Sequence, residues 1–214
     1  AGESTGFLYP FIDADERDPE PLLKDLAASA EAKAAESARL QEATLVATRD
    51  PLEKMAHAMA VRLAAGARLF TFGNGGSSTD AATVAALFSR PPSGRAVAAR
   101  FLVGDSAVVT ALGNDVGYEL VFSRQLEAYG DSGDVALGLS TSGNSLNLMT
   151  AFKWAHREGM LTTGLAGYDG GQMAASSDVD HCLVVGSQSI HRIQETQARL
   201  SFELWSRIQE LLAA

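Results

Sequence analysis

Two short segments rich in glycine and hydroxyl side chains have the composition of an anion-binding site. The first reads Gly-Asn-Gly-Gly-Ser-Ser over residues 73–78, and the second reads Ser-Thr-Ser-Gly-Asn-Ser over residues 140–145. Glycines let the backbone turn sharply and approach a ligand closely, and hydrogen bonds to a charged group such as phosphate contribute about 1.5–3 kcal/mol each. Ser145 is also a natural helix N-cap, but the other hydroxyl groups exceed what capping requires. Either segment alone could be an ordinary turn; together they predict a site for an anionic, hydroxylated ligand.

Both segments lie between a predicted strand and a predicted helix. Apolar runs with strand character cover residues 68–72, 97–103, 135–139, 161–166 and 181–185, and helical patterns cover residues 78–89, 106–112, 118–129, 145–158 and 190–212. This alternation is typical of βαβ units, so we expect a parallel five-stranded sheet flanked by helices on both faces. In such α/β sheets ligands bind at the carboxyl ends of the strands, where both segments fall.

Helical character also precedes the first predicted strand. Residues 21–48 are rich in Ala, Glu, Lys and Leu and contain no Gly or Pro after Pro21, which favours one long helix. Asp50 and Pro51 are typical of the start of a second helix, whereas residues 1–20 have the composition of an irregular arm. We therefore expect an N-terminal arm and helix over residues 1–48 and one α/β domain over residues 49–214. The long helix has an apolar side, which suits either a core-covering helix or a subunit interface.

The composition excludes several classes of protein. The chain has 214 residues, of which 46% are hydrophobic and 20% charged, as in an ordinary globular domain. Its single cysteine, Cys182, cannot form an internal disulfide, so we expect a reducing, cytoplasmic location. We expect neither a transmembrane helix nor a signal peptide. A net charge of −9 disfavours nucleic acids and anionic membranes as partners, although backbone amides can still hold a small anion.

Five motifs in a fixed order give the chain a family resemblance. They are Phe-Gly-Asn-Gly-Gly-Ser (72–77), Asn-Asp-Val-Gly-Tyr (114–118), Ser-Thr-Ser-Gly-Asn-Ser (140–145), Gly-Tyr-Asp-Gly-Gly (167–171) and Arg-Ile-Gln-Glu (192–195). From about residue 50 to the C-terminus the chain resembles the sugar isomerase (SIS) domain, in particular the subgroup of the phosphoheptose isomerases and the DnaA initiator-associating protein. The resemblance implies a flavodoxin-like sheet, a homotetramer and a phosphosugar bound between subunits. The ligand contacts that it implies are Asn74, Gly75, Gly76, Ser77, Asn114, Asp115, Ser140, Thr141, Ser142, Ser145 and Gln194.

The resemblance also implies a set of zinc-binding and proton-transferring side chains, and here the chain departs from it. The heptose isomerases carry a His and a Glu four residues apart after the glycine-rich motif, and a Gln and a His eight residues apart on the last helix. The corresponding residues of this chain are Thr83, Leu87, Gln194 and Phe202. Leu and Phe can neither bind a metal ion nor transfer a proton. We therefore expect no metal and no other cofactor.

These observations lead to a hypothesis and two alternatives. Our interpretation is a phosphosugar-binding protein with a binding or regulatory function, which would signal through a protein partner. The first alternative is an aldose–ketose isomerase of the sedoheptulose 7-phosphate type with a relocated base, for which His191 and Glu195 are the candidates. Both also have structural interpretations, His191 as a capping or surface residue and Glu195 as the ion-pair partner of Arg199. Asp80 is expected to complement the helix dipole. The second alternative is a structural oligomer whose loops bind nothing.

Overall fold

The computed structural model describes residues 20–214, so the arm predicted over residues 1–20 lies outside the described residues except for Glu20. The chain divides into two compact units, residues 1–38 and residues 39–214. Helix α1 spans Glu20–Ala47, which confirms the long N-terminal helix, and its residues 39–47 belong to the second unit. The division of the domains between residues 48 and 49 stays a prediction.

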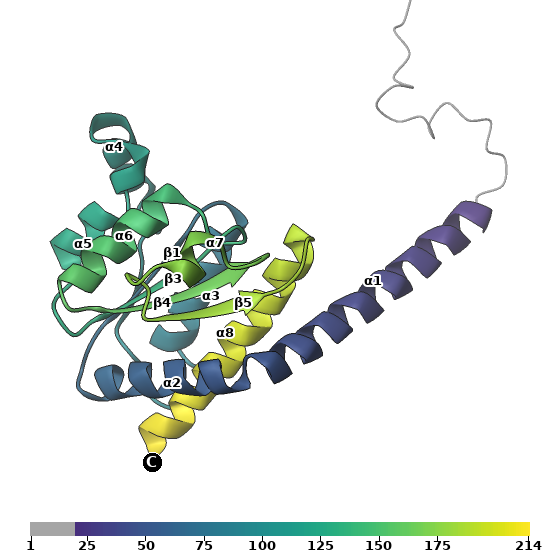
Figure 1. Ribbon diagram of the computed structural model, residues 1–214, viewed down its shortest axis with the longest axis horizontal. Helices are drawn as coiled ribbons and strands as arrows, with labels where there is room; N and C mark the ends of the chain where they lie inside the picture. The colour runs from purple at the N-terminus through teal and green to yellow at the C-terminus, as the bar shows by residue number, and fades with distance from the viewer. Residues whose placement is uncertain (1–19) are drawn as a thin grey trace, which may run out of the picture. The chain divides into compact units, whose positions relative to one another are not determined.

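The second unit is built on a five-stranded sheet (Figure 1). The strands are β1 (Leu69–Gly73), β2 (Ala99–Phe101), β3 (Val135–Leu139), β4 (Leu161–Gly167) and β5 (His181–Val185). Their order is β2-β1-β3-β4-β5, and every neighbouring pair is parallel. This is the flavodoxin-like order, as predicted. β2 is shorter than the predicted run at 97–103, because only its three residues pair with β1.

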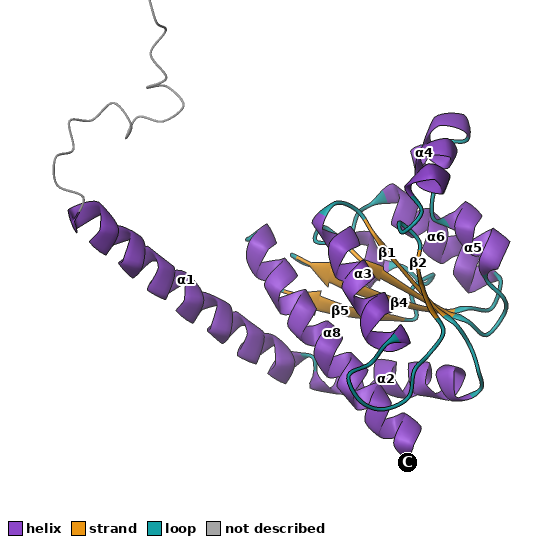
Figure 2. Ribbon diagram, turned by 180° about the vertical axis from the view of Figure 1, so that it is seen from behind, coloured by secondary structure: helices purple, strands orange, loops and turns teal. Residues whose placement is uncertain are grey.

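Helices cover both faces of the sheet (Figure 2). They are α2 (Arg49–Ala64), α3 (Gly76–Ser89), α4 (Ser106–Asp115), α5 (Ser123–Tyr129), α6 (Leu146–Arg157), α7 (Gly171–Ala175) and α8 (Ile190–Ala213). The single helix predicted over residues 118–129 is instead a 3-10 turn, η2 (Tyr118–Leu120), followed by α5. Val121 and Phe122, which separate the two, are buried in the core. α7 has no counterpart among the predicted elements.

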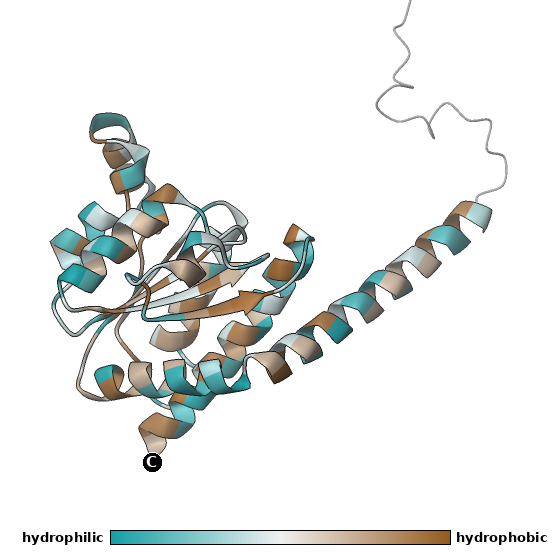
Figure 3. Ribbon diagram, in the orientation of Figure 1, coloured by the Kyte–Doolittle hydropathy of each residue, from teal (hydrophilic) through white to brown (hydrophobic). Residues whose placement is uncertain are grey.

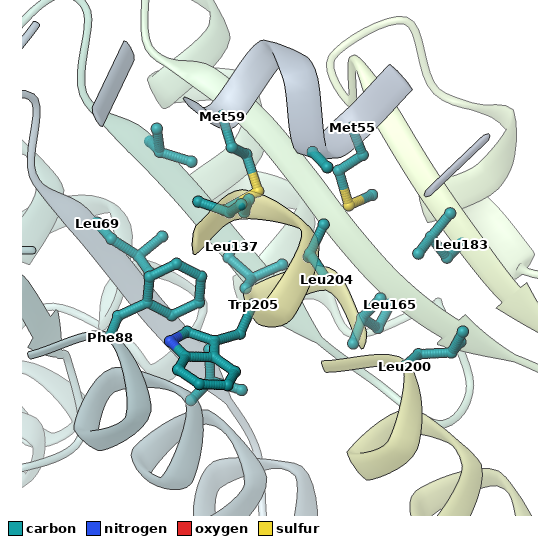
Figure 4. Close-up of a cluster of buried hydrophobic side chains, with 14 of the residues drawn as sticks. Met55, Met59, Leu69, Phe88, Leu137, Leu165, Leu183, Leu200, Leu204 and Trp205 are labelled. Carbon is teal, nitrogen blue, oxygen red and sulfur yellow. The ribbon is translucent and has the colours of Figure 1, made fainter. Parts of the chain in front are cut away.

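Two hydrophobic clusters sandwich the sheet. Helices α2, α3 and α8 pack on one face, where Met55, Phe88 and Trp205 meet strand residues such as Leu137 (Figure 4). The other face is covered by α5, α6 and α7 and holds an aromatic group, in which the rings of Phe122 and Phe152 each lie 5.3 Å from that of Phe72. Because β1, β3 and β4 are buried along their whole length, they appear in the sequence as continuous apolar runs rather than alternating ones.

The described part of the first unit is helix α1 up to residue 38. Apolar and polar residues alternate along this helix (Figure 3), and Leu22, Leu23 and Leu26 are 42%, 59% and 56% exposed. Among residues 20–214, no helix is both long enough and apolar enough to cross a membrane.

Candidate functional site

The two segments singled out in the sequence follow neighbouring strands of the sheet. Residues 73–78, hereafter the glycine loop, begin at the last residue of β1, and residues 140–145, hereafter the serine loop, begin directly after β3. β1 and β3 are paired in parallel, with Gly73 opposite Leu139. Both loops therefore start at the same carboxyl edge of the sheet, the edge at which α/β proteins bind ligands.

The glycine loop depends on its glycines to connect β1 to α3. A Cβ atom on Gly73 would lie 2.7 Å from the carbonyl oxygen of Ser77 and 2.8 Å from that of Leu139, so no larger residue fits. Gly75 has a φ of +53°, which disfavours a side chain. Gly75 and Gly76 are exposed, whereas Ser77 is only 5% exposed. The loop thus presents backbone and the first N–H groups of α3, which have no partner within the helix, rather than side chains.

The serine loop brings three hydroxyl groups together. The Oγ of Ser140 lies 3.4 Å from the Oγ of Ser142 and 3.4 Å from the Oγ of Ser145, and it accepts a hydrogen bond of 3.1 Å from the N–H of Gly143. Ser145 occupies the N-cap position of α6, as its sequence context predicts, but its side chain makes no capping hydrogen bond. The hydroxyl group of Ser145 therefore faces the loop, where it can serve a ligand together with the N-terminal end of α6.

A pair of side-chain amides joins the glycine loop to the start of α6, directly after the serine loop. Asn74 Nδ2 donates to Oδ1 of Asn147 at 2.9 Å, and Asn147 Nδ2 donates back to Oδ1 of Asn74 at 3.0 Å. Tyr118 adds a third bond, because its hydroxyl group donates to the same Oδ1 of Asn74 at 3.1 Å. Asn147 is 3% exposed. The oxygen of the Asn74 amide thus already accepts two hydrogen bonds, whereas Nδ2 has a second N–H, beyond the one that Asn147 accepts, to donate to a ligand.

Asn114 and Asp115 end helix α4 and are exposed. Their side chains bond to each other, with Asn114 Nδ2 donating to Oδ1 of Asp115 at 2.6 Å. The neighbouring Gly113 faces Tyr118, because a Cβ atom on Gly113 would contact the Tyr118 ring at 3.7 Å; the bond between Asn114 and Asp115 is thus the contact that the structure shows for this pair.

Gln194 reaches the glycine loop from the last helix, α8. Its side chain is the nearest group to the position that a Cβ atom of Gly76 would occupy, and its Nε2 donates to Oδ2 of Asp80 at 3.3 Å. Burial raises the pKa of the Asp80 carboxyl above its usual value, and the hydrogen bond from Gln194 offsets part of this rise. Asp80 lies in the second turn of α3, so its partner is Gln194 rather than the first N–H groups of the helix.

The residues that stand where the heptose isomerases carry their zinc and acid–base side chains have other contacts. Thr83 donates its hydroxyl proton to the carbonyl of Thr79 at 3.0 Å. Leu87 packs against the hydrophobic core, and the ring of Phe202, which is 47% exposed, lies 5.4 Å from that of Trp205. Within residues 20–214 no three His, Cys, Asp or Glu side chains come together as metal ligands. Thr83, Leu87 and Phe202 are not among the His, Cys, Asp and Glu ligands that zinc usually takes, so the residues at these positions do not fit zinc.

The two candidates for a relocated base lie in the first two turns of α8. His191 is exposed. Glu195 forms an ion pair of 2.6 Å with Arg192, and Arg199 pairs instead with Glu203 at 2.6 Å. The predicted Glu195–Arg199 pair is therefore wrong, because a carboxylate on a helix can reach a cation three residues before it as well as one four residues after it.

Three partners in this region were missed by reasoning from the sequence. Asn147 follows the serine loop by two residues, so its place at the start of α6 was a usable signal. Tyr118 belongs to one of the five motifs, but nothing in the sequence indicates its hydrogen bond to Asn74. The contact between Asp80 and Gln194 joins residues 114 positions apart, and no local pattern indicates it.

Comparison with known proteins relates most of the chain to one family. Residues 34–167 match the family model described as SIS domain. The phosphoheptose isomerase of Paramagnetospirillum magneticum is 39% identical over 181 residues, which cover 84% of this chain and 93% of that protein. The phosphoheptose isomerase of Leptospira biflexa is 44% identical over 148 residues, which cover 67% of this chain and 75% of that protein.

Solved structures agree with these matches. The phosphoheptose isomerase GmhA from Neisseria gonorrhoeae superposes with a TM-score of 0.80 and 37% identity, over 86% of this chain and 99% of that one. A phosphoheptose isomerase from Francisella tularensis superposes with a TM-score of 0.80 and 28% identity, over 86% of this chain and 98% of that one. The likeness therefore extends over nearly the full length of both relatives.

Proposed function

The chain belongs to the SIS domain family, and from this we propose that it binds a sugar phosphate between the glycine loop and the serine loop. The observation that carries the proposal is the convergence of the Ser140, Ser142 and Ser145 hydroxyl groups beside the start of α6. In the proposed complex these groups, with Thr141, hold the phosphate. The sugar lies against Asn74, Gly75, Gly76, Ser77 and Gln194, with Asn114 and Asp115 at the border of the site.

The relatives favour aldose–ketose isomerisation as the activity of this site. Proteins named phosphoheptose isomerase match most of this chain at about 40% identity. Isomerisation moves a proton between neighbouring carbon atoms and needs a base and an acid. In this chain the base would be relocated, and Asp80 joins His191 and Glu195 as a candidate because its contact with Gln194 brings it to the glycine loop.

A second candidate function is binding without isomerisation, in the service of regulation. It is favoured by the apolar side chains of Leu87 and Phe202, which replace a Glu and a His of the heptose isomerases and can neither accept nor deliver a proton. In this version the bound sugar phosphate is a signal that a protein partner reads. In both versions the proposed assembly is a homotetramer, to be measured by light scattering.

Ser145→Ala tests the binding proposal. The variant is expected to weaken binding of sedoheptulose 7-phosphate about tenfold in calorimetry, since one hydrogen bond to a charged group is lost. Its melting temperature should stay close to that of the unchanged chain, because the hydroxyl group makes no capping bond. Ser132→Ala is the matched control, because Ser132 is exposed and precedes β3 at the opposite edge of the sheet. An unchanged chain that binds neither this sugar phosphate nor inorganic phosphate would refute the proposal.

Turnover separates the two versions. The purified chain is incubated with sedoheptulose 7-phosphate, and the appearance of the aldose is followed by NMR, with the zinc content measured on the same sample. An enzyme with a relocated base is supported if the unchanged chain isomerises the sugar phosphate and one variant still binds it but no longer isomerises it. The variants are Asp80→Asn, His191→Gln and Glu195→Gln. Binding without turnover supports the regulatory version.

A further inference from the structure

Tyr118 bonds to the side-chain amide of Asn74 in the glycine loop, although it comes from neither loop. It begins the 3-10 turn η2, and its hydroxyl group donates to Asn74 Oδ1 at 3.1 Å. The residue is 56% exposed, so burial of its ring does not account for its position. One side of the ring faces the end of α4 at Gly113. Tyr118 thus connects Asn74 with the helix end that carries Asn114 and Asp115.

The direction of this hydrogen bond follows from the partners behind it. The N–H of Leu148 donates to one atom of the Asn147 amide at 3.0 Å, which identifies that atom as the oxygen Oδ1. The other end of the same amide is then Nδ2, and it donates to Oδ1 of Asn74. Because Oδ1 of Asn74 can only accept, Tyr118 must be the donor.

A tyrosine hydroxyl group that already donates its proton to a hydrogen bond can only accept further hydrogen bonds, through the lone pairs of its oxygen. Those lone pairs accept from hydroxyl groups but repel the unprotonated oxygens of a phosphate. The hydroxyl group of Tyr118 therefore favours a hydroxyl group of a ligand over an unprotonated phosphate oxygen. It suits a polyhydroxylated part of a ligand, and it has nothing to offer to an inorganic anion that binds in the serine loop.

We propose that Tyr118 is a specificity-determining residue, which holds Asn74 by its proton and accepts a hydrogen bond from a hydroxyl group of the sugar. The inference rests on the proposed function, because it assumes that a sugar phosphate binds between the loops. It adds the residue that distinguishes the sugar from the phosphate alone.

Calorimetry on the full chain tests the inference with two probes, sedoheptulose 7-phosphate and inorganic phosphate. Tyr118→Phe removes only the hydroxyl group and is expected to raise the Kd for sedoheptulose 7-phosphate about threefold to tenfold, as for one neutral hydrogen bond. The Kd for inorganic phosphate should change less than twofold. Tyr129→Phe is the matched control, because Tyr129 is also partly exposed and its ring stacks with Arg100 at 3.8 Å, away from Asn74. This control should leave both values unchanged.

The outcomes separate this inference from the proposed function. An unchanged chain that binds neither probe removes the proposed function and the inference with it. If the unchanged chain and Tyr118→Phe have the same Kd for sedoheptulose 7-phosphate, the inference alone is overturned. Equal weakening of both probes, together with a melting temperature lowered by more than about 4 °C, also overturns it, because the hydroxyl group would then act only in folding.

Discussion

At the scale of single residues, the side chains around the glycine loop are held by distant parts of the chain. Asn74 pairs with Asn147, 73 positions away, and with Tyr118, 44 positions away. Composition and glycine spacing were enough to predict that the two loops lie at the same carboxyl edge of the sheet, and their binding of a ligand stays a prediction. The partners of their side chains could not be predicted, because a polar side chain at a loop can bond to many groups and only the tertiary arrangement selects one.

Cys182 offers a test of burial at this scale. The thiol lies on β5, and desolvation raises its pKa to about 12, against about 8.5 for an unfolded thiol. Only the thiolate reacts with iodoacetamide, so labelling at pH 8 should be at least tenfold slower in the native chain than in guanidinium chloride. Equal rates in the two states would contradict the burial of this thiol.

The same shift has a consequence for stability against pH. Above pH 8.5 the unfolded chain loses the thiol proton while the native chain keeps it, so the free energy of unfolding should fall as the pH rises toward 12. Below pH 8.5 both states are protonated and this contribution is constant. Cys182→Ala has no thiol, and its free energy of unfolding should therefore decline less steeply between pH 8.5 and pH 10 in urea titrations.

At the scale of helices and strands, the sequence predicts most of what the structure contains. All five strands and most of the helices follow from apolar runs and helical periodicity, because a parallel sheet buried on both faces needs such runs. The errors fall where tertiary contacts decide. η2 and α5 are separated by the buried residues Val121 and Phe122, and α7, with five residues, is too short to show a period.

The packing of β3 against α6 and β1 predicts a position that tolerates no side chain. A Cβ atom on Gly138 would lie 2.5 Å from Cζ of Phe152 and 3.0 Å from Cε2 of Phe72. Gly138→Ala should lower the free energy of unfolding by about 1–3 kcal/mol, as for an overpacked core, measured by urea denaturation. Gly186→Ala is the control, because no atom lies within 4 Å of its Cβ position. If Gly138→Ala has the same free energy of unfolding as this control, the rings of Phe152 and Phe72 move to accommodate the methyl group without loss of stability.

At the scale of the whole chain, the two compact units differ in how much of their apolar surface they bury. All buried residues of the two hydrophobic clusters lie between Met55 and Ile208, within the second unit. The described part of the first unit contributes no buried residue. The second unit therefore contains the hydrophobic burial that drives folding. Leu40 and Leu45 of α1 pack against its core, whereas Leu22, Leu23 and Leu26 are exposed and available for contacts with another molecule.

This difference predicts that the two units can be separated. A chain that begins at residue 39 should keep a cooperative urea transition, because it retains both hydrophobic clusters. If Leu22, Leu23 and Leu26 form a subunit contact, its mass by light scattering should fall below that of the full-length assembly, since burial of exposed leucines is what would stabilise that contact. Replacing the three leucines by alanine in the full-length chain should reproduce the fall while preserving the helix, because alanine has the highest helix propensity. A truncated chain that keeps the full-length oligomeric state would instead assign the subunit contacts to residues 39–214 alone.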